Sequence, residues 1–175
     1  MKRLMLPVCV AVLLFAACKK DNVPPAPVIL YGFGFEDTSG VQDFEGWSGV
    51  NYTLVNDVPT DGGNWSLQLT PGVSPAEGYV ETDLSFNTAA TFNMTFTADV
   101  KTTGTAYIAV LHKSSSGSVD TLSSGTYTNS TWQTVSQNVS VNLQTGDKLG
   151  IYLSAGSTTL DTWQSNFDNI QLQEN

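Results

Sequence analysis

The chain has 175 residues and a formal net charge of −9, with sixteen acidic side chains against seven basic ones. Beyond residue 28 the imbalance grows, because only Lys101, Lys113 and Lys148 oppose fifteen acids there and the formal charge is about −12. A domain with this charge repels phosphate backbones and acidic polysaccharides, which argues against nucleic acid as a partner. Neutral ligands and cations remain as candidates.

The N-terminus has the features of a secretory signal, which we place at residues 1–17. Two basic residues, Lys2 and Arg3, precede an apolar run over residues 4–17. This run is shorter than the ~20 residues that a helix needs to cross the hydrocarbon core of a membrane, and no second apolar run follows it. The sequence therefore predicts export without a transmembrane span.

A cysteine follows the signal directly. Residues 14–18 read Leu-Phe-Ala-Ala-Cys, which resembles the lipobox of bacterial lipoproteins, although Phe15 stands where leucine is usual. The resemblance implies that Cys18 is lipidated, becomes the new N-terminus and anchors the chain to a membrane. The alternative is an ordinary cleaved signal with an incidental cysteine. Because Cys9 lies within the signal, the domain itself is expected to contain no disulfide.

Residues 18–28 are expected to form a spacer between the anchor and the domain. The prolines of this segment favour extended polyproline II structure, and its composition offers nothing to bury. Its Lys-Lys-Asp run at residues 19–21 resembles the segments that send some Gram-negative lipoproteins to the cell exterior. We therefore expect an outer-membrane lipoprotein that faces outside, with a periplasm-facing lipoprotein as the alternative.

Residues 29–175 are expected to form one all-β domain. Apolar and polar residues alternate with a period of two, most clearly from Phe92 to Val100, and no period of 3.6 appears. Two serine-rich stretches, residues 114–118 and 123–125, have the composition of loops. The expected strands cover residues 31–36, 50–55, 65–70, 78–84, 92–100, 105–111, 133–141, 148–154 and 166–173.

Four segments occur in an order that carries a resemblance. They are Gly-Phe-Glu-Asp at residues 34–37 with Gly-Trp at 46–47, Asp-Gly-Gly-Asn-Trp-Ser-Leu-Gln-Leu at 61–69, Trp-Gln-Thr-Val-Ser at 132–136 and Asn-Phe-Asp-Asn-Ile-Gln-Leu at 166–172. Together they resemble the galactose-binding-like jelly rolls of carbohydrate-binding modules of the CBM4/CBM22 type. The resemblance implies a two-sheet antiparallel jelly-roll β-sandwich and a sugar ligand.

The same resemblance implies a structural calcium ion that joins the chain ends. In modules of this type an acid near the first strand, an acid in the last strand and a glycine-rich loop hold the ion. Calcium prefers six to eight hard oxygen ligands, which carboxylates and loop carbonyls supply. The alternative is that these acids cap turns or face water. The matching positions are Glu36, Asp61, Gly63, Asn64 and Asp168.

Strand parity indicates a separate binding face. If Val80 and Leu84 point into the core, the alternation turns Tyr79, Glu81 and Asp83 to the opposite side, and the same argument places Tyr107 and Tyr152 outside. Exposed tyrosine rings can stack on the apolar faces of sugars while carboxylates accept hydrogen bonds from sugar hydroxyls. The alternative is that these rings pack into the other sheet or lie scattered.

The tryptophans divide into two groups. Trp47 and Trp163 stand beside expected turns, so they are candidates for ligand contact from loops. Trp65 shares parity with Leu67 and is expected in the core. The resemblance implies a structural role for Trp132.

No pattern in the sequence favours catalysis. Glu81 and Asp83 form a weak carboxylate pair, because two acids on one strand more often share a solvated edge than flank a cleft. His112 is the only histidine, and no Gly-x-Ser-x-Gly, H-E-x-x-H or phosphate-binding motif is present. We therefore expect a non-catalytic module that binds a neutral oligo- or polysaccharide. The alternative is a structural or adhesive module that docks to a partner protein at the cell surface and binds no sugar.

Overall fold

The structure is a computed structural model that describes residues 27–72, 77–155 and 163–175. Cys18, the expected signal and residues 18–26 of the expected spacer lie outside the described residues. The described part of the chain forms eleven β-strands in two antiparallel sheets. None of its segments is a helix long and apolar enough to span a membrane.

The strands divide between a six-stranded and a five-stranded sheet. In the six-stranded sheet the order is β3-β4-β11-β6-β9, and β1 pairs with β11 beside this path. In the five-stranded sheet the order is β2-β5-β10-β7-β8. The strands are β1 (Val28–Phe33), β2 (Trp47–Val50), β3 (Tyr52–Val55), β4 (Ser66–Leu69), β5 (Tyr79–Ser85), β6 (Ala90–Thr102), β7 (Ala106–Lys113), β8 (Val119–Tyr127), β9 (Gln133–Leu143), β10 (Lys148–Ser154) and β11 (Ser165–Glu174).

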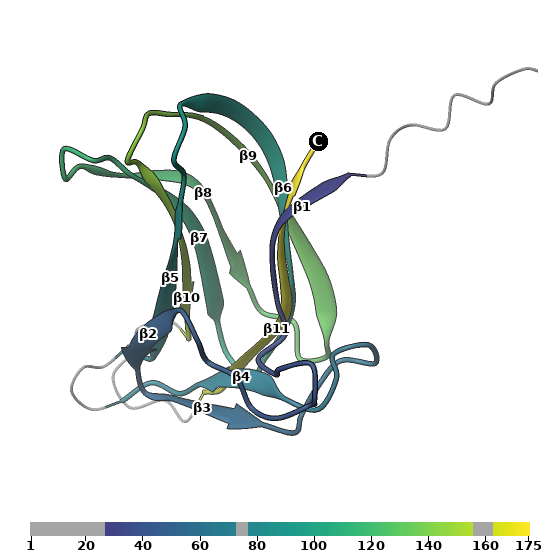
Figure 1. Cartoon of the computed structure of the whole chain (residues 1–175). Coiled ribbons are helices and arrows are strands. Elements are labelled where there is room, and N and C mark those ends of the chain that lie inside the picture. The colour runs from purple at the N-terminus through teal and green to yellow at the C-terminus, as the bar shows by residue number, and fades with distance from the viewer. Residues whose placement is uncertain (1–26, 73–76, 156–162) are drawn as a thin grey trace, which may run out of the picture.

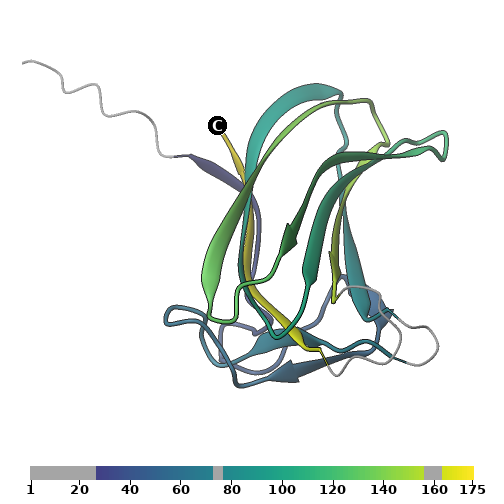
Figure 2. The ribbon, with the colours of Figure 1, turned by 180° about the vertical axis from the view of Figure 1, so that it is seen from behind.

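The two sheets pack face to face, as the ribbon in Figure 1 shows with both sheets nearly edge-on. The first strand, β1, runs antiparallel to the last, β11, so Val28 lies beside Glu174. The hairpin that joins β7 to β8 extends beyond the rest of the five-stranded sheet in both views (Figures 1 and 2). The predicted antiparallel two-sheet sandwich is confirmed.

The alternation of the sequence places the core between the sheets. Ile108, Ile151 and Leu153 of the five-stranded sheet face Phe96 and Leu172 of the six-stranded sheet across the interior, and all five are fully buried. Side chains of successive strand residues point to opposite faces, so the residues between them lie on the outer faces of the sandwich. The parity argument for β5, β7 and β10 is confirmed.

Two strands differ from the sequence expectation. The expected strand 50–55 is split at Asn51, whose positive φ of 57° turns the chain, so that β2 joins one sheet and β3 the other. The stretch 123–125, expected as a loop, lies within β8 at the edge of the five-stranded sheet. Its serines and glycine form a strand because the backbone pairs with β7, which overrides their weak strand propensity.

A buried aspartate holds two turns together at one end of the five-stranded sheet. Asp147 accepts backbone hydrogen bonds from Ser115 in the β7–β8 hairpin and from Gln144 in the β9–β10 turn, each at 2.9 Å. Its Oδ2 also lies 2.9 Å from His112 Nε2. These donors, led by the two backbone N–H groups, hold the pKa of Asp147 well below its ordinary value. The carboxylate therefore stabilises this end of the fold in its ionised form.

We predict that Asp147→Asn lowers the melting temperature at neutral pH, because an amide offers one acceptor oxygen where the carboxylate offers two. A depressed folded-state pKa adds stability above the unfolded-state value of about 4, and this stability is lost as the pH falls through the folded-state pKa. Thermal unfolding followed by circular dichroism should therefore show the gap between wild type and variant narrowing below about pH 4. A gap that stays constant on acidification would contradict the role given to the ionised carboxylate.

Candidate functional site

The predicted tyrosines lie together on the outer face of the five-stranded sheet. Register pairs Tyr79 and Tyr107 with the same residue of the central strand, Ser154, and pairs Tyr152 with Glu81. Cross-strand partners share a face, so one row of side chains crosses three strands. We call this surface the tyrosine face, and it comprises Tyr79, Glu81, Asp83, Tyr107, Lys113, Lys148 and Tyr152.

The three rings form a cluster rather than a flat platform. Tyr79 and Tyr152 are stacked, with ring centroids 5.6 Å apart and an interplanar angle of 23°. Tyr107 meets Tyr152 edge to face at 6.2 Å and 68°. Because the rings cover part of one another, each is half-buried. A ligand can therefore reach only the outward parts of this cluster.

Glu77 fixes the orientation of the central ring. Its Oε1 accepts hydrogen bonds from the hydroxyls of Tyr152 and Ser154, both at 2.6 Å. Burial, followed by the hydrogen bond to Glu77 and the charge of that carboxylate, raises the pKa of Tyr152 well above its ordinary value. Glu77 is absent from the sequence-based set of candidates, although it stands two residues before Tyr79 and so continues the same parity.

The other half of the tyrosine face carries charged side chains. Lys113 forms ion pairs with Glu81 and, at 2.7 Å, with Asp83. Burial acts to lower the pKa of Lys113, but hydrogen bonds to the two carboxylates outweigh it and raise the pKa. Glu81, predicted as a ligand contact, is thus engaged by a lysine. Lys148 lies 3.5 Å from Asp83, with 48% of its side chain exposed.

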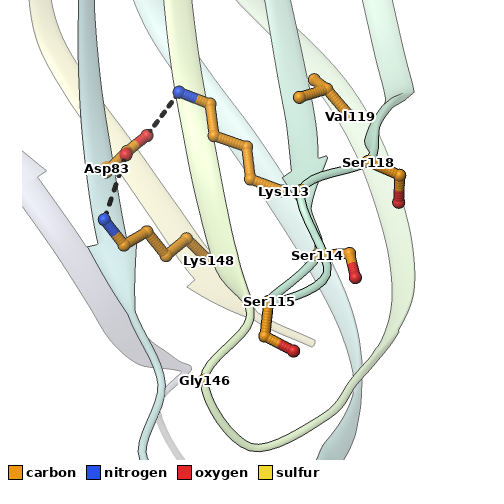
Figure 3. A pocket seen from close by; sticks show the side chains of 9 residues that line it. Asp83, Lys113, Ser114, Ser115, Ser118, Val119, Gly146 and Lys148 are labelled. Atoms are coloured by element: carbon orange, nitrogen blue, oxygen red, sulfur yellow. Dashed lines mark hydrogen bonds and ion pairs between the residues drawn. The ribbon is translucent and has the colours of Figure 1, made fainter.

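An open hollow of about 430 Å³ lies at the charged end of the tyrosine face, where the β7–β8 hairpin and the β9–β10 turn meet (Figure 3). Its lining combines two ammonium groups, one carboxylate, three serines and one apolar side chain. The close-up shows Asp83 between the two lysine ammonium groups (Figure 3). We call this cavity the hairpin hollow. It is lined by Asp83, Lys113, Ser114, Ser115, Gly117, Ser118, Val119, Gly146 and Lys148.

The tryptophans predicted as ligand contacts do not join the tyrosine rings. Trp47 begins β2 with its side chain in the core, 7% exposed and against Phe33 and Phe35, which corrects its assignment as a loop contact. β2 is not among the strands expected from the sequence. Trp47 is buried because it occupies a position of β2 whose side chain points into the core. Trp163 is half-buried, and its ring covers Gly104, where an added Cβ would lie 2.1 Å from the indole.

A second cluster joins the segment after β1 to β11 around two carboxylates. Glu36 follows β1, and its Oε2 accepts hydrogen bonds from the backbone N–H groups of Asn64 and Trp65, each at 2.8 Å. Gly63 has a φ of 67°, and an added Cβ there would lie 1.4 Å from Glu36 Oε1, so this loop position requires glycine. Trp65, expected in the core, is half-buried beside this loop and donates to Gly40 O at 3.1 Å.

Asp168 is the buried member of this cluster. Its side chain is fully inaccessible to solvent, and its Oδ2 has no hydrogen-bond partner among the described residues. Burial raises its pKa to about 8, and the charges of Glu36, Asp99 and Asp61 add to the shift. An added Cβ at Gly62 would lie 2.3 Å from Asp168 Oδ2, so the loop closes directly over this oxygen.

These residues fit a cation in part. Glu36, Asp168 and the backbone of the 61–64 loop come together as the resemblance implied, and a buried carboxylate oxygen without a partner is the kind of atom that a cation or a proton satisfies. Asn64 instead places its side chain against Gly40. Within the described ranges no three Asp, Glu, His or Cys side chains are grouped to hold a metal, so backbone oxygens would have to complete the shell.

Neither carboxylate group has the arrangement of a catalytic pair. Glu81 and Asp83 both form ion pairs with Lys113. Asp168 has the raised pKa of a general acid, but it is buried beneath the 61–64 loop, where no substrate can reach it. His112 contacts the buried Asp147, whose other partners are backbone amides.

Comparison with known proteins identifies the fold. No family model matches the sequence, and the search of curated proteins found no match. Among solved structures, a family 16 carbohydrate-binding module has a TM-score of 0.53 and 17% identity, covering 73% of this chain and 90% of its own. The CBM22-2 xylan-binding domain of Xyn10C from Paenibacillus barcinonensis has a TM-score of 0.54 and 13% identity, covering 83% and 99%.

An enzyme also contains this fold as a part. The enzymatically active domain of tailspike protein 4 from bacteriophage CBA120 has a TM-score of 0.59 and 15% identity, and the match covers 76% of this chain but 20% of the tailspike. In contrast, the two carbohydrate-binding modules above are matched over 90% and 99% of their own length. At these identities the likeness establishes the fold, and the jelly roll expected from the order of the four sequence segments is confirmed.

Proposed function

We propose that the chain is a non-catalytic carbohydrate-binding module that recognises a neutral glycan on the tyrosine face. The observation that carries the proposal is the clustering of Tyr79, Tyr107 and Tyr152 on the outer face of the five-stranded sheet. Aromatic rings stack on the apolar faces of sugars, and hydroxyl and carboxylate groups around them hydrogen-bond sugar hydroxyls. The fold of the solved carbohydrate-binding modules supports this assignment.

The charge of the face favours a neutral glycan. Glu77, Glu81 and Asp83 carry three negative charges against the two positive charges of Lys113 and Lys148, on a domain that is strongly acidic overall. Such a surface gives an acidic polysaccharide no net attraction. Mixed donors and acceptors instead match sugar hydroxyls, each of which both donates and accepts.

Docking to a partner protein is less well supported. A docking surface of this kind needs a contiguous apolar patch. Among the described residues, the exposed large apolar side chains are spread over β1, the loop after it, β3 and β8. Val119 is the one at the edge of the tyrosine face.

The carboxylate cluster is proposed as a structural calcium site. Glu36 and Asp168 would supply the charged oxygens, and backbone carbonyls of the 61–64 loop would complete the shell. Calcium would replace the proton that the raised pKa of about 8 keeps on Asp168 near neutral pH. Its contribution would be to join the segment after β1 to β11 and to the loop before β4.

The chain is further proposed to be a lipoprotein, anchored through Cys18 and displayed on the outer membrane. Cys18 and the segment that follows it lie outside the described residues, so this rests on the sequence alone. The fold is compatible with such display. The chain enters the domain through β1 of the six-stranded sheet, whereas the tyrosine face lies on the five-stranded sheet.

Glycan binding is tested by calorimetric titration of the soluble domain against neutral plant and microbial polysaccharides. Wild type should show saturable binding, and Tyr152→Ala should weaken it about 30-fold, or about 2 kcal/mol, because the central ring of the cluster is lost. Tyr52→Ala is the matched control, since Tyr52 is exposed on β3 of the other sheet. The proposal would be wrong if wild type bound none of the polysaccharides, or if both variants lost affinity equally.

The calcium site is tested by thermal unfolding in chelator and in calcium. Saturating calcium should raise the melting temperature of wild type by roughly 5–10 °C. The increase should become larger as the pH rises towards 8, because calcium binds the ionised form of Asp168. Asp168→Asn should lose the increase, whereas Asp120→Asn, which removes an exposed charge on β8, should keep it. A shift retained in Asp168→Asn would rule out this site.

Lipid anchoring is tested by fractionating cells that express the full chain. The wild-type protein should partition with membranes and be cleaved by protease added to intact cells. Cys18→Ser should move it to the soluble fraction, because no acyl chain can then be attached. Membrane association that survives the substitution would contradict the anchor, and protection of the wild type from external protease would favour the periplasm-facing alternative.

A further inference from the structure

We propose that the hairpin hollow is a second, polar subsite for the same glycan, so that the chain binds an oligosaccharide lying lengthwise along β10. This inference rests on the proposed function of the tyrosine face. The tyrosines alone would bind a short sugar. The hollow adds a separate contact for the far end of a longer chain.

The two ends of the face lie along one strand. Tyr152 and Lys148 belong to β10 and point to the same side, four residues apart. An extended strand rises about 3.3 Å per residue, so the tyrosine cluster and the hollow are about 13 Å apart. That separation is too long for one sugar ring and suits an oligosaccharide.

The Lys113 side chain crosses β10 between the two ends of the face. Gly150 lies between Tyr152 and Lys148, and Ala109 pairs with Tyr152 on the neighbouring strand. The aliphatic stem of Lys113 lies beside Gly150, where an added Cβ would be 3.0 Å from Lys113 Cε. A bound chain would therefore pass over the Lys113 stem and its ion pairs with Glu81 and Asp83 between the rings and the hollow.

The hollow offers groups that match sugar hydroxyls. Lys113 is held by Glu81 and Asp83, whereas Lys148 reaches only Asp83, at 3.5 Å, and is half exposed. Lys148 can thus turn its ammonium group to a ligand without leaving Asp83 unpaired, because Lys113 still contacts Asp83 at 2.7 Å. Val119, 58% exposed, gives the wall an apolar contact for a sugar ring.

The two turns that form the hollow are linked in the absence of ligand. Asp147 ties Ser115 of the β7–β8 hairpin to the β9–β10 turn, and an added Cβ at Gly146 would be 3.5 Å from Ser115 Cβ, so the two turns touch. A preformed site loses less conformational entropy on binding than a flexible one. This is the property expected of a subsite rather than of an accidental gap between turns.

The experiment is calorimetric titration of the soluble domain with ladders of xylo-, gluco- and galacto-oligosaccharides, from the disaccharide to the hexasaccharide. The affinity of the wild type should rise with length until the chain spans both ends of the face. Lys148→Met keeps the aliphatic stem and removes the ammonium group. It should weaken hexasaccharide binding about tenfold, a clearly larger loss than it causes for the disaccharide. Val119→Ser should give a smaller loss in the same direction.

The controls separate this inference from the proposed function. Tyr152→Ala should weaken binding at every length, and Lys101→Met should change none, because Lys101 pairs with Asp57 away from the tyrosine face. Hexasaccharide binding by Lys148→Met that equals wild type, with Tyr152→Ala still impaired, would overturn the second subsite and leave the glycan face standing. If wild type binds none of the oligosaccharides, both the proposed function and the second subsite are wrong.

Discussion

One apolar core between two sheets is the constraint on which the rest of this molecule depends. Because each strand buries alternate residues, placing Ile108 and Ile151 in the core forces their neighbours Tyr107 and Tyr152 to the outside. Register between antiparallel strands then gathers these outward residues into one patch. The described part of the chain has no helix to cover that patch, so the same packing that stabilises the sandwich also presents the tyrosine face to solvent.

The two ends of that face are chemically different, and the difference arises from the strand connections. At one end, Glu77 precedes β5 and orients Tyr152. At the other end, the β7–β8 hairpin and the β9–β10 turn are held by the buried Asp147 and enclose the hairpin hollow. Lysine and carboxylate pairs lie between these ends. The face therefore combines an aromatic contact with a polar one along a single strand direction.

The opposite sheet brings the first and last described strands together. Its strands β1 and β11 pair, and the carboxylates of Glu36 and Asp168 meet beneath the 61–64 loop. A buried carboxylate with an unpartnered oxygen is costly unless a proton or a cation satisfies it, which links the stability of this junction to pH and to the ions present. Asp168 of the junction and the tyrosine face belong to different sheets.

The sequence by itself determined the all-β class and the parity of the strands, because a period of two is a local property of the chain. The resemblance to carbohydrate-binding modules, and not the pattern of residues, implied that Glu36 and Asp168 come together. Only the tertiary structure decided that β8 is a strand, that Trp47 is buried and that Tyr79 stacks on Tyr152. These features depend on partners distant in sequence: β8 gains its hydrogen bonds from β7, and ring orientation follows from packing across strands. Local patterns therefore indicate which face a residue occupies, whereas the neighbours that give the face its chemistry are set by the fold.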